Sequence, residues 1–180
     1  MDNVFICPVD DDTAAFGMTL EVGCALEGVL PFVHDEGQRR ALEQCYPDGR
    51  CHVWGLRDRG ENVSSWSAMA PGDLVLGYRK RSILSASTVR MKTRNPELAN
   101  YLWDPTAEGP FELICFAGKP HVGEAPIVSQ MLGYLDQEYG GFTRLGPDKC
   151  RAILHAFGSL DVFVRLGLRY DFPFSFRHSE

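Results

Sequence analysis

The feature that most constrains the fold is a pair of apolar runs joined by three consecutive cations. Leu74 to Tyr78 is a short apolar run, and Ser82 to Lys92 is a longer run with few bulky residues. Arg79, Lys80 and Arg81 separate the two runs. Two such runs around a short connection are typical of a β-hairpin. We therefore predict two antiparallel strands with a positively charged tip, and a sheet at the centre of the fold.

Three further segments predict strands: Asn3–Val9, Arg50–Trp54 and Phe111–Ala117. Each is short, rich in apolar or β-branched residues and bounded by polar residues, glycine or proline. The spacing of these segments and their turns indicates that the second and third lie in one curved sheet with the hairpin.

Helices are predicted between and after the strands. Asn62 is expected to cap a short helix in which Val63, Trp66 and Met69 share one face. A second helix begins at Asn95-Pro96-Glu97 and runs to about Trp103. Other predicted helices span residues 35–45, 126–134, 147–157 and 160–166. Short strands mixed with short helices indicate an α+β domain on a small, partly closed sheet.

Charge is unevenly distributed along the chain. The formal net charge of −6 opposes nucleic-acid binding, because phosphate contacts depend on lysine and arginine. Residues 54–94, however, carry eight Lys or Arg against three Asp or Glu. An acidic body with one basic segment is typical of a local anion site.

Several functional classes lack their sequence signatures. No phosphate-loop, dinucleotide, H-E-x-x-H or G-x-S-x-G pattern occurs, so we expect a binding domain rather than an enzyme. No apolar run is long enough to span a membrane and no basic segment opens the chain, which predicts a cytoplasmic protein. The cysteines are scattered, which predicts reduced, mostly buried thiols and no metal site or cofactor. They are Cys7, Cys24, Cys45, Cys51, Cys115 and Cys150.

The segment from Trp54 to Trp103 carries an ordered set of motifs. It reads W-G-L-x(5)-N-x(3)-W-x(2)-M-x-P-G-D-L-V-L-G-Y, then S-A-S-T-V, then N-P-E-L-A-x(2)-L-W. Residues 141–145 and the helix from Lys149 to Phe157 follow. This order resembles the EVE/YTH-like branch of the PUA-like superfamily, and especially the N-terminal modified-DNA reader of McrB-type, modification-dependent restriction proteins. The resemblance covers residues 51–163.

The resemblance implies a small PUA-like β-barrel flanked by short helices, which receives a flipped, modified base in an aromatic pocket, with methylation the expected modification. It implies double-stranded DNA as the partner, with RNA as an alternative, and a GTPase motor and nuclease on other domains or subunits. Residues 50–166 would form the reader, 1–49 an N-terminal extension packed on the barrel, and 167–180 a tail or linker. The apolar ending at residues 172–176 favours a fragment of a longer protein.

The expected base-binding residues are Trp54, Asn62, Trp66 and Tyr78. Aromatic rings restore part of the stacking that a flipped base loses, and a carboxamide both donates to and accepts from a base edge. Phosphate contacts are expected from Arg57, Arg59, Arg79, Lys80, Arg81, Arg90 and Lys92.

Structural alternatives exist for each of these residues. Trp66 shares a helical face with Val63 and Met69 and fits a core position equally well. Trp54 also fits a core position, and the cations of the hairpin fit a solvated surface without a ligand. Asn62 fits the role of a helix cap, and Tyr78 that of a barrel residue. At the level of function, the alternatives are a protein-interaction module without nucleic-acid binding and, third, a small enzyme acting on a nucleotide.

Overall fold

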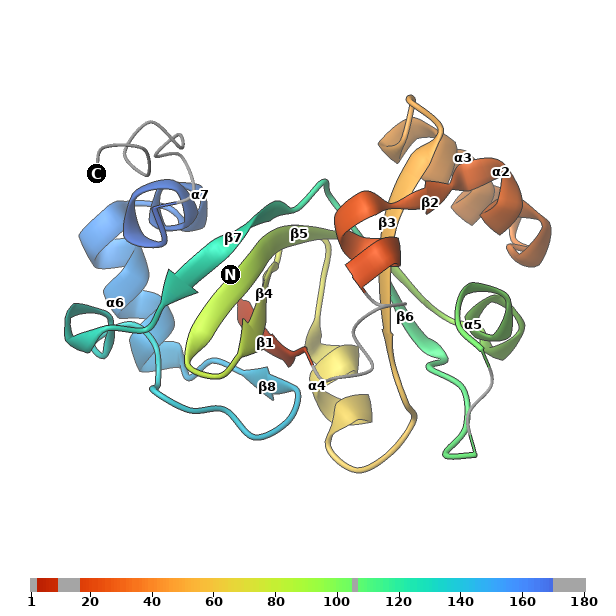
Figure 1. Cartoon of the computed structure of the whole chain (residues 1–180). Helices are drawn as coiled ribbons and strands as arrows, with labels where there is room; N and C mark the ends of the chain where they lie inside the picture. Colours follow the sequence, from red (N-terminus) through yellow and green to blue (C-terminus); the bar gives the residue numbers. More distant parts are fainter. Residues whose placement is uncertain (1–2, 10–16, 105–106, 170–180) are drawn as a thin grey trace, which may run out of the picture. The chain divides into compact units, whose positions relative to one another are not determined.

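The computed structural model describes residues 3–9, 17–104 and 107–169 (Figure 1). The acidic run at residues 10–12 and the apolar ending at 172–176 lie outside the described residues. The chain forms two compact units, and the segments of the two units alternate along the sequence. Unit 1 comprises Met1–Pro8, Asp73–Ala86 and His121–Glu180, and unit 2 comprises Val9–Gly72 and Ser87–Pro120. These units do not follow the boundaries expected at residues 49 and 166, and the assignment of residues 50–166 as a reader stays a prediction.

Unit 1 is built on strands that pair in both directions. β1 runs parallel to β4 and antiparallel to β8, while β7 is antiparallel to the first part of β5. The strands are β1 (Val4–Pro8), β4 (Leu74–Arg79), β5 (Ser82–Arg94), β7 (His121–Pro126) and β8 (Thr143–Arg144). The predicted strand at residues 3–9 is thus confirmed as a member of the sheet.

Helices from the C-terminal third complete the core of unit 1. They are the 3-10 turn η3 (Ser129–Met131), α6 (Pro147–Phe157), α7 (Leu160–Val162) and the π-helical η4 (Phe163–Gly167). Ile6, Leu76, Ile153 and Phe163 are fully buried in one apolar cluster. Gly158, with φ 78°, ends α6 because glycine adopts the left-handed conformation without strain.

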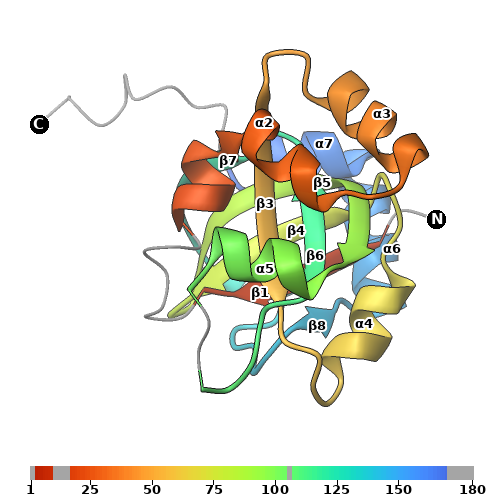
Figure 2. The ribbon, with the colours of Figure 1, turned by 90° about the vertical axis from the view of Figure 1, so that its right-hand side faces the viewer.

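Unit 2 combines the second part of β5 with β6, β3 and the short β2. Its remaining elements are η1 (Met18–Val22), β2 (Cys24–Ala25), α2 (Leu26–Val29), η2 (Leu30–Phe32), α3 (Glu36–Cys45), β3 (Arg50–Leu56), α4 (Asn62–Ala68), α5 (Pro96–Leu102) and β6 (Leu113–Ala117). Val53 of β3 and Ile114 and Phe116 of β6 are fully buried with apolar residues of α2, α3 and α5. Figure 2 shows α5 in front of β3 and β6. One face of this part of the sheet is therefore covered by helices.

The predicted sheet is confirmed. Its strand path is β2-β3-β6-β5-β4-β1-β8, with β7 paired to β5. The four strands expected to share a sheet, β3, β4, β5 and β6, are consecutive neighbours on that path. Within the described ranges, no helix is long and apolar enough to cross a membrane.

The helix predicted at residues 126–134 is wrong. Pro126 ends strand β7, and only the single turn η3 follows it. Pairing with β5 holds residues 121–126 extended, and the Ile127 amide donates to the Arg81 carbonyl. Tertiary pairing here overrides a local helix signal, as it often does for short strands.

Candidate nucleic-acid interface

Three cations, Arg79 at the end of β4 and Lys80 and Arg81 after it, lie at a tight turn in unit 1 and are called here the cationic tip. β4 ends at Arg79 and β5 begins at Ser82, so Lys80 and Arg81 are the two central residues. Their φ angles are 48° and 65°, both left-handed. Two-residue hairpins of this type normally use Asn-Gly or Asp-Gly, because other residues are strained there. The tip therefore has two cations at positions where asparagine or glycine would cause less backbone strain.

Contacts around Arg81 hold the cationic tip in place. Its carbonyl accepts from the Ile127 amide at 2.8 Å, and its amide donates to Tyr78 Oη at 3.3 Å. Its guanidinium donates to Glu138 through Nε at 3.0 Å and through Nη2. Arg81 is thus fixed on both its backbone and its side chain.

The other two cations of the tip are available to a ligand. Arg79 and Lys80 are exposed, and neither pairs with an acid among the residues that the structure describes. Flexible, hydrated cations of this kind bind phosphate without reading base sequence. The tip accordingly offers two uncompensated charges beside one, Arg81, that Glu138 compensates.

Tyr78 connects the cationic tip to the apolar core of unit 1. Its side chain is 7% exposed and belongs to the apolar core of unit 1. Its ring meets Tyr139 edge-on at 5.2 Å, and its hydroxyl donates to the Gln137 carbonyl at 3.4 Å. Burial raises the pKa of Tyr139 to about 12, and Tyr139 Oη accepts from the Asp136 amide at 2.7 Å. Tyr78 therefore links the hairpin to residues 136–139.

In unit 2, a row of three side chains crosses the sheet on the face opposite the helix-covered one. Trp54 of β3 and Lys92 of β5 are both register partners of Cys115 on β6. Directly opposed residues of antiparallel strands point to the same face. Trp54, Cys115 and Lys92 therefore share one face of the sheet. We call these three residues and Trp66 of α4 the aromatic face.

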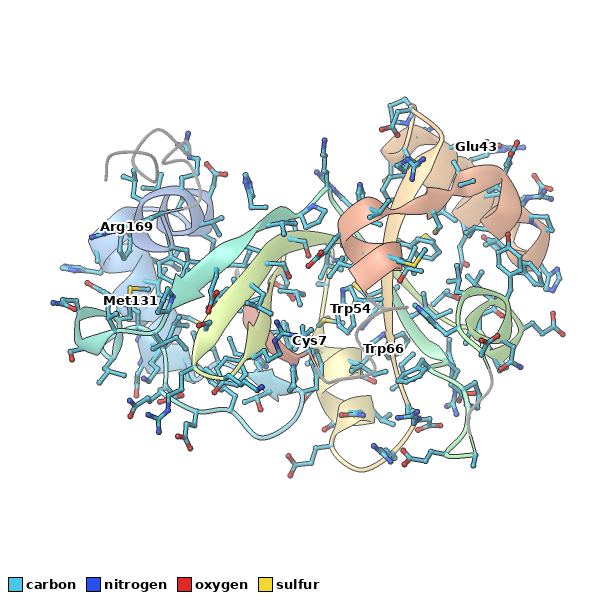
Figure 3. The ribbon with its side chains drawn as sticks, in the orientation of Figure 1. Cys7, Glu43, Trp54, Trp66, Met131 and Arg169 are labelled. Atoms are coloured by element: carbon cyan, nitrogen blue, oxygen red, sulfur yellow. The ribbon has the colours of Figure 1, made fainter. Side chains whose placement is uncertain are left out.

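Trp66 is the half-buried ring of the aromatic face. Its indole Nε1 donates to the Ile114 carbonyl at 3.4 Å, next to the register partner of Trp54. The ammonium of Lys92 lies 4.8 Å from the Trp66 ring centroid. It also donates to the carbonyls of Trp66 and Ser67 at 2.8 and 2.7 Å, where α4 ends. The Trp66 ring thus contacts β6 one residue from the register partner of Trp54, and Lys92 lies beside the Trp66 ring. Figure 3 labels both tryptophans.

Trp54 differs from Trp66 in exposure. It is fully buried, at 0%, among the largest enclosed side chains of the chain. A base can contact the Trp54 ring only if the residues that bury the ring move away. Trp103, which follows α5, is 7% exposed, and its indole donates to Thr19 Oγ1.

Asn62 does not cap α4, contrary to the expectation from the sequence. It is the first residue of the helix, and the cap position falls on Glu61, whose side chain makes no capping bond. The Asn62 amide nitrogen instead donates to the Arg57 carbonyl at 3.0 Å and closes the loop before the helix. Its amide oxygen accepts no hydrogen bond from the described residues. The first turn of the helix that carries Trp66 thus has a side-chain acceptor without a partner among the described residues.

The remaining expected phosphate contacts are engaged to different degrees. The Arg57 side chain is only 12% exposed, pairs with Glu108 and lies 4.0 Å from the Phe111 ring centroid. Arg59 also pairs with Glu108, at 3.1 Å. Arg90 is exposed and lies against Gly118, where a Cβ atom would come within 3.2 Å of its Nε. Acids compensate much of the positive charge of the basic segment in unit 2.

Sequence reasoning missed the acids that do this. Glu108 lies 49 residues from Arg59, and Glu138 lies 57 residues from Arg81; nothing in the local sequence marks those pairs. Arg94 is likewise paired, with Asp58 and Glu112. Across the described residues, no cluster of three or more histidines, cysteines or acids is placed to hold a metal ion.

The architecture is similar to that of a solved DNA-bound domain. The structure matches the N-terminal domain of Thermococcus gammatolerans McrB bound to m5C DNA, with a TM-score of 0.60 and 13% sequence identity. The match covers 87% of this chain and 98% of that domain. No family model and no curated protein matches the chain.

This likeness establishes a shared fold. The predicted α+β class is confirmed, with a mixed sheet and several short helices. The resemblance to the N-terminal domain of McrB-type proteins, which rests on the motifs between Trp54 and Trp103, is confirmed at the level of the fold.

Proposed function

We propose that this protein is a non-catalytic reader of a modified base in double-stranded DNA, with methylation the expected modification. The base is flipped from the duplex, and the reader serves as the specificity module of a modification-dependent restriction system. A GTPase motor and a nuclease would lie on other domains or subunits, in the cytoplasm. The observation that carries this proposal is the shared fold with a domain bound to m5C DNA, over 87% of this chain and 98% of that domain.

The aromatic face supports a role in holding the base. A half-exposed indole with a cation beside it offers a stacking surface and a positive charge at the same place. The free amide oxygen of Asn62 matches the exocyclic amino group that adenine and cytosine both carry. We assign stacking on the base to Trp66 and recognition of the base edge to Asn62. Trp54 would stack on the opposite side of the base once the residues that bury its ring move away.

The cationic tip supports a role in holding the backbone. Arg79 and Lys80 are exposed and uncompensated, which suits phosphate contact. Tyr78, expected as a third wall, anchors the tip through its hydroxyl. Arg90 and Lys92 are assigned to phosphates near the aromatic face, while Arg57 and Arg59 would have to release Glu108 first.

Binding to matched labelled duplexes tests the proposal. The duplexes carry 5-methylcytosine, 5-hydroxymethylcytosine, N6-methyladenine or no modification, in one sequence context and over a series of salt concentrations. We expect one modified duplex to bind at least about tenfold more tightly than the unmodified one, with affinity falling as salt rises. The same panel made in RNA tests the alternative reader.

The other outcomes are equally decisive. Tight binding only to modified RNA would replace DNA as the partner. The absence of salt-dependent binding to any duplex would favour a protein-interaction module. Chemical change of the duplex or of a nucleotide during the assay would show an enzyme.

A further inference from the structure

A pair of cysteines in unit 2 faces each other across two neighbouring strands. Cys24 of β2 and Cys51 of β3 are register partners, although they lie 27 residues apart in the sequence. Their Sγ atoms are 3.4 Å apart and share a hydrogen bond. Cys24 is half-buried, whereas Cys51 is fully buried. Cys24 is therefore the more exposed residue of the pair, and the Cys51 thiol lies next to it in the core.

The surroundings of this pair hold it in place. Gly23 has φ 81°, and a Cβ atom there would lie 2.9 Å from the Arg50 side chain and 3.0 Å from the Cys51 carbonyl. Only glycine allows the chain to pass so close to β3. Arg50 Nη1 donates to the carbonyls of Val22 and Gly23 at 3.2 and 3.0 Å, which fastens the approach to β2 against β3.

The electrostatics favour ionisation of the outer thiol. The hydrogen bond from the Cys51 thiol is the largest influence lowering the pKa of Cys24, and the positive charge of Arg50 lowers it further. The same bond and burial raise the pKa of Cys51. Because Cys24 is the more exposed residue and Cys51 is fully buried, a thiolate at Cys24 beside a protonated thiol at Cys51 is the favoured singly ionised state. The thiolate is the nucleophilic form of cysteine.

We propose that Cys24 and Cys51 form a peroxide-oxidisable dithiol, in which Cys24 is the reactive and Cys51 the resolving cysteine. The Cys24 thiolate attacks one oxygen of a hydroperoxide; the O–O bond breaks, giving a sulfenic acid at Cys24 and hydroxide. The Cys51 sulfur then attacks the Cys24 sulfur, its proton leaves with the hydroxyl as water, and a disulfide forms. Hydrogen peroxide takes two electrons from the two thiols, and two water molecules result.

Cys45 provides a control within the same unit. It is exposed at the end of α3 and has no thiol partner among the described residues. Reactivity that came from exposure alone would make Cys45 the most reactive thiol. Reactivity that came from the pair makes Cys24 faster, by about tenfold or more.

The experiment treats the full, reduced chain with hydrogen peroxide and maps thiols by alkylation and mass spectrometry. We expect one Cys24–Cys51 disulfide, with a mass loss of about 2 Da, before Cys45 is modified. Cys51→Ser should stop at a sulfenic acid on Cys24, which dimedone traps. Cys45→Ser should form the disulfide at the wild-type rate. The oxidised protein should melt about 5 °C or more above the reduced one, because the crosslink closes a long loop.

The contrary results are clear. Oxidation of Cys45 at the same rate as Cys24, or a disulfide joining any other two cysteines, would overturn the proposal. So would a Cys51→Ser protein that is folded by circular dichroism but gives no dimedone adduct at Cys24. The wild-type map decides the matter even if a variant fails to fold.

Discussion

The cationic tip of unit 1 and the aromatic face of unit 2 both carry positive charge, but they hold it differently. Arg79 and Lys80 at the tip are exposed, without acidic partners among the described residues. Lys92 on the aromatic face donates to two carbonyls at the end of α4, and Arg57 and Arg59, in the loop before α4, share Glu108. The tip therefore has two cations without acidic partners and no exposed aromatic ring. The aromatic face has a half-buried aromatic ring, and its cation, Lys92, is already hydrogen-bonded to the protein.

This difference separates two tasks that one basic segment of sequence had suggested together. Free cations release counterions and set the salt dependence of binding, without regard to the base. A positioned ring contributes stacking and hydrogen-bond geometry, which depend on the base. Mutations in the two regions should accordingly change different measured quantities.

Trp54→Ala is expected to have the largest effect. Truncating a fully buried indole should lower the free energy of unfolding by about 3–5 kcal/mol, through reduced apolar burial and the cavity left behind. Chemical denaturation of wild type, Trp54→Ala and Trp54→Phe measures this change, and the phenylalanine variant should retain part of the stability. A Trp54→Ala protein that keeps its stability but no longer prefers the modified duplex would instead make Trp54 a direct wall of the site.

Trp66→Ala should change discrimination more than stability. Its ring is half-buried, and stacking on a base contributes about 1–3 kcal/mol, so preference for the modified duplex should fall by about 5- to 150-fold. Tyr101→Ala is the matched control, because Tyr101 is an exposed aromatic residue on α5 that stacks on Phe32. Unchanged preference in a folded Trp66→Ala protein would remove the aromatic face from base recognition.

Replacing Arg79, Lys80 and Arg81 together by alanine tests the tip. Affinity for modified and unmodified duplexes should fall by the same factor, about tenfold, and the salt slope should decrease by about 0.9 for each phosphate that the variant no longer neutralises. The control replaces Lys149, Arg151 and Arg165, which are cations paired with acids on unit 1. A tip variant that binds modified and unmodified duplexes equally well but keeps its salt slope would reverse the roles of the two regions.

Glu138→Gln should have the smallest effect, and in the opposite direction. Removing the acid frees Arg81 to meet phosphate, so both duplexes should bind about two- to fivefold more tightly. Asp148→Asn, which frees Arg151 instead, serves as the control. Weaker binding by the Glu138→Gln protein would show that the ion pair positions Arg81 for its ligand rather than competing with it.

The sequence was sufficient for most elements of the fold. The hairpin, β3, β6, α5 and α6 follow from local patterns of apolar residues, caps and turns, and the structure has them within a few residues. Strand β7 was missed because residues 121–126 carry no local strand pattern and are extended only through pairing with β5. The short strands β2 and β8 were missed for the same reason: their pairing partners are remote in the sequence.

The candidate site was less predictable than the fold. The sequence marked the tip and the two tryptophans as residues of interest, but exposure distinguishes Trp54 from Trp66 and depends on the packing of the whole unit. Arg57 and Arg81 meet acids from distant segments, which no local pattern reveals. Asn62 also shows that a residue typical of a cap can serve the preceding loop instead.

The left-handed turn at Lys80 and Arg81 also bears on how the protein would respond to engineering. A non-glycine residue held in this region costs on the order of 1 kcal/mol, so Lys80→Asn with Arg81→Gly should raise the melting temperature while removing two charges. A search for thermostable variants would therefore favour substitutions that remove two of the cations proposed to contact phosphate. Under the proposed function, selection for DNA binding and laboratory selection for stability are expected to choose different residues at this turn.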